Sequence, residues 1–189
     1  MAELRRSSPL AAFRMANRPG LPVGLIALPP STRIAIRAGP EALPALAWTF
    51  GVAFSQIACR AMMSKDRAAL WLGPDEWLFI APEGSAAELL PAATAALAGT
   101  PASLVDVSHR TVAIAVTGPS AAAALNAFVP LDLDDAAFPV GSCTRTLLGK
   151  AEIVLWRTGI VEYRLEVARS FAAYVWRLLE EASRQYPVE

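Results

Sequence analysis

The sequence predicts an α+β protein of two similar βαββα-type halves, in which mostly antiparallel sheets are backed by helices, with an extended N-terminal arm. The first observation is length, because 189 residues suffice for one compact domain or for two small halves that share a core. The second is a repeated strand–Gly-Pro–helix junction, IAIRAGPEAL at 34–43 and IAVTGPSAAA at 114–123. The third is that further strands and a closing helix follow each junction. The predicted pseudo-repeats span residues 32–107 and 108–189.

Residues 1–31 precede the first repeat and have little periodicity, which predicts an extended arm and not a domain. Five prolines interrupt regular structure here: Pro9, Pro19, Pro22, Pro29 and Pro30. Apolar residues such as Leu10, Phe13 and Leu25 make the segment too hydrophobic for a solvated tail. We therefore expect the arm to lie on its own body or on a neighbouring subunit.

The first half opens with the alternating, isoleucine-rich strand Thr32–Ala38. Gly39-Pro40 ends that strand, and Pro40 suits the first turn of a helix that runs to about Phe50. A hairpin, a helix and a last strand are then predicted at Ala68–Leu72, Trp77–Ala81, Ser85–Ala98 and Ala102–Val107. The turn residues 73–76 separate the two hairpin strands.

The second half repeats this plan with a strand at Thr111–Thr117, a Gly118-Pro119 break and a helix from Ser120 to Phe128. Three more strands are predicted at Cys143–Leu148, Ala151–Arg157 and Ile160–Val167. Ser170 is the expected N-cap of a final helix that reaches about Tyr186. Helices on one face of each sheet would leave the other faces to meet each other or a partner.

The composition favours a subunit over a free monomer. Hydrophobic residues make up 54% of the chain and charged residues 18%, which is more apolar than an average soluble domain. Either the core is large for this length, or part of the surface is buried against a partner. Basic and acidic residues balance at 17 each, and no basic cluster is interleaved with aromatics, so we expect no nucleic-acid partner.

Membrane insertion and metal binding are not expected either. The uncharged runs 42–59 and 111–131 are both interrupted by proline and glycine, which argues against a membrane span. Cys59 and Cys143 form no CxxC pair, and a single histidine gives no zinc constellation. Two buried thiols in a reducing cytoplasm are the expectation, with a structural disulfide as the alternative. The N-terminus lacks the features of a secretory signal, which also favours a cytoplasmic location.

The predicted hairpin holds the first group of candidate interface or structural residues. Trp71 and Trp77 flank its turn, where a tryptophan either stacks on a cofactor or, more often, packs against a helix or an interface. Asp75 and Glu76 are expected at the exposed tip, either paired with an arginine of a partner or solvated.

The second group lies between the two halves. Asp106 and Ser108 are expected to satisfy backbone donors in a tight turn, and Asp106 is also placed to pair with Arg110. His109 is either a general base or ligand, or it holds the turn through ring hydrogen bonds, which we favour. Because no nucleophile elbow and no GxGxxG motif is present, we expect no catalytic, cofactor-binding or metal-binding residue in this chain.

Several motifs resemble known families. Asp106-Val107-Ser108-His109, followed by Gly118-Pro119 and later by Gly141, resembles the folate-binding domain of the glycine-cleavage T-protein (aminomethyltransferase) family. A fuller resemblance covers almost the whole chain through Ser8-Pro9-Leu10, LGPDEWL at 72–78, Asp106–Arg110, and FPVG at 138–141 through Arg145-Thr146. These segments are similar to the gamma subunits of heterotetrameric sarcosine oxidase.

The resemblance implies an accessory subunit of an enzyme that oxidatively demethylates sarcosine to glycine. That reaction yields hydrogen peroxide and, with tetrahydrofolate, methylenetetrahydrofolate. The resemblance also implies FAD, FMN, NAD and tetrahydrofolate in larger alpha and beta subunits, zinc in a small delta subunit, and no cofactor in this chain. One alternative is an independent folate-binding, aminomethyltransferase-like protein. Another is the equivalent subunit of an N-methylglutamate dehydrogenase-type complex.

The aminomethyltransferase alternative requires a carboxylate near the folate. In that family it lies in a Gly-Gly-x-x-Asp-Asp segment of a hairpin, and the corresponding stretch 148–153 here, LGKAEI, lacks the Asp-Asp pair. Glu152 is the nearby carboxylate. Because side chains alternate along a strand, we expect it to face solvent as readily as a substrate. The motif therefore argues against one-carbon chemistry by this chain.

Overall fold

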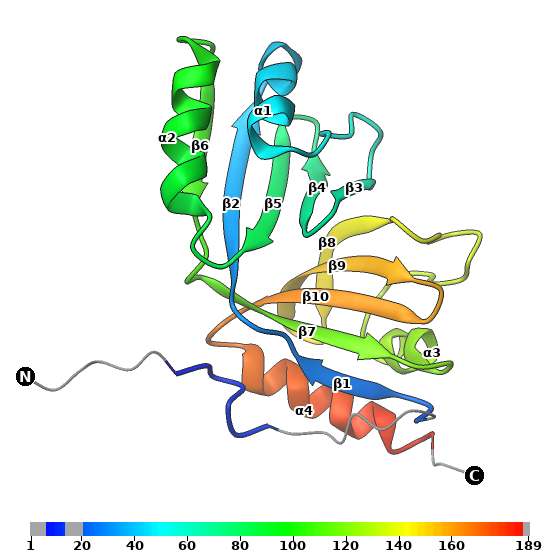
Figure 1. Ribbon diagram of the computed structural model, residues 1–189. Coiled ribbons are helices and arrows are strands. Elements are labelled where there is room, and N and C mark those ends of the chain that lie inside the picture. The colour runs from blue at the N-terminus through cyan, green and yellow to red at the C-terminus, as the bar shows by residue number, and fades with distance from the viewer. Residues whose placement is uncertain (1–6, 14–20, 187–189) are drawn as a thin grey trace, which may run out of the picture.

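The computed structural model describes residues 7–13 and 21–186, which form two five-stranded sheets (Figure 1). The first sheet contains β2 (Ser31–Ala38), β3 (Ala61–Ser64), β4 (Arg67–Gly73), β5 (Glu76–Pro82) and β6 (Ala102–Asp106). The second contains β1 (Gly24–Ala27), β7 (Thr111–Thr117), β8 (Cys143–Leu148), β9 (Ala151–Gly159) and β10 (Glu162–Ala168). All neighbouring strands pair antiparallel. The predicted α+β class with antiparallel sheets is confirmed.

The two sheets have the same strand order. The first runs β3-β4-β5-β2-β6 and the second runs β8-β9-β10-β7-β1. In each half a first strand and a helix lead into a meander of three strands and a second helix. The fifth position differs in its origin, because β6 follows the helix of its own half, whereas β1 comes from the N-terminal segment of the chain.

Helices cover the outer face of each sheet (Figure 1). A 3-10 turn, η1 (Pro40–Ala42), leads into α1 (Leu43–Phe50), which packs with α2 (Ala86–Leu97) on the first sheet. Helices α3 (Ala121–Asn126) and α4 (Ala172–Ser183) lie on the second sheet. These layers give each half its own hydrophobic core, as the helical spacing of apolar residues requires. In the described part of the chain, no helix combines the length and apolar content needed to cross a bilayer.

The inner faces of the two sheets meet each other. Ala68, Leu70, Leu78 and Ile80 of the first sheet form one buried cluster with Cys143 and Trp156 of the second. Backbone contacts continue the junction, because Arg60 and Ser142 form an isolated antiparallel bridge. The two halves are therefore joined through packed sheet faces as well as through the covalent connection.

The described part of the N-terminal segment packs on the second half. Leu10, Val23 and Leu25 are buried in the core of that half, and the ring of Phe13 lies 5.9 Å from that of Trp176. Strand β1 pairs along β7 from Gly24 to Ala27. The segment thus supplies a strand and core residues where the sequence predicted an extended arm; residues 1–6 and 14–20 lie outside the described residues.

The sequence patterns missed β1 and β3, since both are four residues long and neither shows a run of alternating β-branched residues. The expected N-cap was also wrong. Phe171, not Ser170, occupies the cap position of α4, and no side chain caps this helix. Likewise Cys59, expected to be buried, is exposed.

Candidate functional site

The turn between the halves is held by side-chain hydrogen bonds. The Ser108 amide donates to Oδ1 of Asp106 at 2.9 Å, and the Ser108 hydroxyl donates to the same oxygen at 2.5 Å. These hydrogen bonds from Ser108 lower the pKa of Asp106. The Ser108 Oγ in turn accepts from the backbone amide of Arg33 at 2.9 Å, which fixes the turn to β2.

Other residues of this turn are less engaged. His109 and Arg110 are exposed, and in the described part of the chain Asp106 forms no ion pair with Arg110. Asp106, Ser108 and His109 line a shallow recess of about 290 Å³ together with Glu83 and the start of α2. The geometry assigns Asp106 and Ser108 to the turn itself.

A cluster of paired charged side chains lies next to this turn, between the two sheets. Nε of Arg33 on β2 lies 2.5 Å from Oε2 of Glu166 on β10, and these residues are 1% and 2% exposed. Arg164 binds the other carboxylate oxygen at 2.8 Å. Both strands alternate, so Ile34, Ile36 and the apolar residues of β10 face the helices while the charged ones face the opposite sheet.

The predicted hairpin tip is paired within the chain. Arg37 lies 2.8 Å from Asp75 and 3.0 Å from Glu76, and Arg145 of β8 lies 2.6 Å from Glu76. The hydrogen bond from Arg145 lowers the pKa of the Glu76 carboxyl. Because arginines of both halves bind it, this tip contributes to the junction of the halves.

The two tryptophans of the hairpin pack inside the protein. Trp77 is 1% exposed and its Nε1 donates to the Ser55 carbonyl at 2.9 Å, which holds the loop after α1. Trp71 is partly buried against the core of the first half, and its carbonyl accepts from the Cys143 thiol at 3.4 Å. Both positions fit the packing interpretation of these residues.

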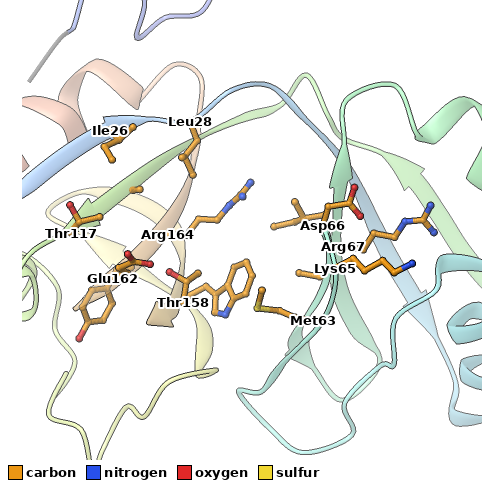
Figure 2. A pocket seen from close by; sticks show the side chains of 15 residues that line it. Ile26, Leu28, Met63, Lys65, Asp66, Arg67, Thr117, Thr158, Glu162 and Arg164 are labelled. Atoms are coloured by element: carbon orange, nitrogen blue, oxygen red, sulfur yellow. The ribbon is translucent and has the colours of Figure 1, made fainter. Parts of the chain in front are cut away.

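Two hollows open between the sheets. A cleft of about 340 Å³ brings together Glu76, Trp77 and Arg110 of the candidate residues with Arg145 and Glu166. A second hollow of about 410 Å³ opens near the other end of the same interface. Figure 2 shows Leu28, Glu162 and Arg164 on its one side and Met63, Lys65 and Asp66 on the other.

Two further polar groups lie at this junction. Glu152, at the rim of the cleft, has a side chain 66% exposed and lies 3.7 Å from Arg145. Burial raises the pKa of the Cys143 thiol to about 12, so this sulfur is protonated at neutral pH. No group of three or more His, Cys, Asp or Glu residues within 7–13 and 21–186 is placed to hold a metal ion.

The sequence did not single out the residues whose ion pairs join the two halves. Arg33, Glu166 and Arg145 all lie in strands at polar positions of an alternating pattern, and none was among the candidates. Charged residues at those positions could have indicated that the inner sheet faces carry charged as well as apolar side chains. The pairs Arg33–Glu166 and Arg145–Glu76 depend on how the two sheets meet, and strand patterns carry no information about that packing.

Comparison with known proteins agrees with this architecture. A family model described as the sarcosine oxidase, gamma subunit family matches residues 38–185. The sarcosine oxidase subunit gamma of Corynebacterium sp. (strain P-1) is 33% identical, with 97% of this chain and 93% of that protein covered. The gamma subunit of an Arthrobacter species is 36% identical over 82% of this chain and 78% of its own length.

Two solved structures share the fold. A chain of the heterotetrameric sarcosine oxidase from Corynebacterium sp. U-96, in complex with pyrrole 2-carboxylate, superimposes with a TM-score of 0.87 at 30% identity, covering 96% of each chain. The glycine cleavage system aminomethyltransferase T of Bartonella henselae superimposes with a TM-score of 0.60 at 17% identity, over 86% of this chain and 46% of that one. The second likeness concerns the fold.

The doubled sheet-and-helix body is therefore an α+β fold that the aminomethyltransferase T structure shares, and paired charges and packed side chains fill its junction. Within that class the chain belongs to the sarcosine oxidase gamma subunit family. The resemblance seen in the LGPDEWL and Asp106–Arg110 segments is confirmed.

Proposed function

We propose that this chain is the accessory gamma subunit of a heterotetrameric sarcosine oxidase and has no catalytic group of its own. The observation that carries the proposal is the 33% identity to a curated gamma subunit across 97% of the chain. The match to a solved heterotetrameric sarcosine oxidase at a TM-score of 0.87 supports the same place in an assembly.

The side chains at the junction support a structural role. The inner faces of the sheets hold arginines and glutamates that bind one another, and the family-motif residues Asp106 and Ser108 bind backbone. The one-carbon carboxylate of aminomethyltransferases has no counterpart other than the exposed Glu152. A group that performs proton transfer must lie within hydrogen-bond reach of a substrate, which these paired groups do not offer.

The reaction itself would belong to partner subunits. In this proposal larger alpha and beta subunits hold FAD, FMN, NAD and tetrahydrofolate, and a small delta subunit holds zinc. The complex demethylates sarcosine to glycine and forms hydrogen peroxide and, with tetrahydrofolate, methylenetetrahydrofolate. We also place the complex in the cytoplasm, a location that the two unbridged thiols Cys59 and Cys143 support.

Co-expression tests the proposal. We expect this chain to co-purify with the alpha, beta and delta chains encoded in the same organism, and sarcosine-dependent peroxide formation to require the flavin-bearing chains. The purified chain by itself should form no peroxide. Failure to associate with those chains, or turnover of sarcosine by the isolated chain, would refute the assignment.

Two alternatives have separate tests. The likeness to aminomethyltransferase T favours an independent folate-binding protein, and calorimetric titration of the isolated chain with a reduced folate tests it. Tight binding would support that function, whereas no heat of binding is expected from a gamma subunit. Replacing sarcosine by N-methylglutamate in the peroxide and dehydrogenase assays distinguishes the equivalent N-methylglutamate complex.

A further inference from the structure

The charged side chains at the junction of the sheets are not balanced. Arg33 and Arg164 both bind the Glu166 carboxylate, and their side chains are only 2% and 18% exposed. Within the described part of the chain, neither arginine forms an ion pair with any other carboxylate. Because a buried charge without a counter-charge is unfavourable, two cations that share one anion favour a second anion at this place.

Donor groups beside this excess charge lack an acceptor. Nε of Arg164 donates to Glu166, whereas its two terminal nitrogens donate no hydrogen bond to any residue that the structure describes. Nε1 of Trp156, a residue 4% exposed, is likewise without an acceptor among the described residues. Buried N–H groups are almost always paired in folded proteins, so these two side chains are suited to an acceptor that the chain itself does not supply.

The two side chains are direct neighbours on the inner face of the second sheet. Arg164 of β10 lies opposite Trp156 of β9 and, on its other side, opposite Ala115 of β7. Residues directly opposite each other on antiparallel strands share a face, with their Cβ atoms about 4.5–5.5 Å apart. Ile26 of β1 lies opposite Ala115. Since alanine is small, the row leaves space and apolar surface beside the guanidinium of Arg164.

This row forms one wall of the hollow of about 410 Å³ between the sheets. Figure 2 shows the side chain of Arg164 directed into the space between the two halves. Other apolar side chains complete the lining: Leu28, Met63, Ala68 and Ile80. A volume of this size and a mostly apolar lining with a few polar groups are typical of sites for small molecules.

The other charged groups of the hollow do not neutralise Arg164. Asp66 and Glu162 are exposed, and neither forms an ion pair with it. Figure 2 shows the head groups of Lys65 and Arg67 directed away from Arg164, and Arg67 donates to the last carbonyl of α1 at 2.9 Å. Arg164 is therefore the cation that a ligand in the hollow would meet.

We propose that this hollow binds a small organic carboxylate with an apolar body. One carboxylate oxygen accepts from Arg164 and the other from Nε1 of Trp156, while the apolar body lies against Ala115 and Ile26. The ligand thus supplies the second anion that the arginines lack, through charge-assisted hydrogen bonds. Because Nε1 of Trp156 lies beneath the surface of the hollow, a wall side chain has to move, and the flexible, 59% exposed Met63 is suited to do so.

Titration of the purified full-length chain with benzoate tests this site. The indole N–H signals are followed in ¹H–¹⁵N NMR spectra, and the Trp156 signal is identified by its absence in Trp156→Phe. This signal should shift downfield and saturate with a dissociation constant on the order of 1 mM, as expected for a ligand of this size. The signal of Trp48, exposed on α1, should stay unchanged. Absence of a saturable shift at Trp156 would overturn the inference.

Two analogues separate the parts of the ligand. Benzyl alcohol keeps the ring without a charge, and acetate keeps the carboxylate without the ring. Each should bind the unaltered chain at least roughly tenfold more weakly than benzoate, because each loses either the charge-assisted hydrogen bonds or the apolar burial. Benzyl alcohol that binds as tightly as benzoate would show that the hollow does not recognise an anion.

Arg164→Met tests the cation. This variant leaves Glu166 bound to Arg33 and should bind benzoate at least roughly tenfold more weakly. The matched control is Lys65→Met, which removes a cation from the opposite wall and should bind like the unaltered chain. Thermal unfolding shows whether each variant is folded; if Arg164→Met is not, the analogue comparison on the unaltered chain decides. Unchanged affinity in a folded Arg164→Met variant would refute the site.

The inference goes beyond the proposed function and is tested separately from it. The titration uses this chain alone, whereas the proposed function is tested by association with the other subunits. If addition of those subunits abolishes benzoate binding, a partner fills the hollow in the assembly, and the small-molecule ligand is overturned while the proposed function stands.

Discussion

Nε of Arg33 lies 2.5 Å from Oε2 of Glu166, and this contact joins the interior strands β2 and β10 of two different sheets through two almost fully buried side chains. Arg164 binds the second oxygen of the same carboxylate, so one anion is shared by two cations. The apolar cluster between the sheets is small, so this charged cluster makes up much of the contact between the two halves. Removal of either partner should therefore have unequal consequences.

Substitution of Glu166 by glutamine should be strongly destabilising. Both Arg33 and Arg164 would lose their counter-charge, and an unpaired buried charge typically costs about 3–5 kcal/mol. Urea denaturation of the purified chain measures the free energy of unfolding. The comparison variant is Arg33→Met, which leaves Glu166 bound to Arg164 and should lose less stability. Equal losses in the two variants would contradict the shared-anion arrangement.

Strand alternation accounts for how much of this fold could be predicted. In β2 and β10 every second residue is apolar and faces the helices, so the sequence indicates two half-buried strands and the helices that cover them. It could not indicate that Arg33 meets Glu166, because 133 residues separate them and the contact depends on how two separate sheets approach. Local patterns specify elements, whereas this pairing is set by their packing.

The N-terminal strand shows the same limit. Residues 24–27 are too few to give a period, and their place beside β7 follows from an open edge of the second sheet that exists only after folding. The motif residues Asp106 and Ser108 were accessible to prediction because an Asx turn is local. The partner of Glu76 was not accessible, since Arg145 comes from the other half of the same chain.

Gly118→Ala should destabilise the protein by about 3 kcal/mol. Gly118 has φ +106°, and a Cβ there would lie 2.5 Å from the Pro22 carbonyl oxygen, so both backbone strain and a clash with β1's leading segment arise. Gly84→Ala is the matched control, with φ +86° and no atom within 4 Å of the added Cβ. It should cost about 1 kcal/mol, the conformational part alone. Thermal unfolding measures both; similar losses would mean that the close approach to Pro22 is unimportant.

Glu76 should make stability depend on pH in the acidic range. Its pKa is lowered in the folded protein, so it contributes stability above the ordinary glutamate pKa of about 4.3 and loses it as the pH falls through the lower folded value. Glu76→Gln should be less stable than the unaltered chain at pH 7, by about 1 kcal/mol or less because Arg145 and Arg37 are substantially exposed. Denaturation curves between about pH 7 and pH 3 should converge at the acidic end. A difference that persists there would show that the carboxylate charge is not the cause.

The two cysteines should differ in reactivity although they lie on neighbouring segments, where the Cys143 amide donates to the Cys59 carbonyl at 2.9 Å. Cys59 is exposed, whereas burial raises the pKa of Cys143 to about 12, so on the order of one Cys143 thiol in ten thousand is ionised at pH 8. Because the thiolate is the nucleophile, iodoacetamide at pH 8 should alkylate Cys59 alone in the folded chain and both thiols in urea, as followed by peptide mass spectrometry. Cys59→Ser should make the folded chain almost unreactive. Alkylation of Cys143 at a rate similar to that of Cys59 would show that the junction of the sheets opens readily, since the sulfur is reachable only when Trp71 and the inner cluster move away from it.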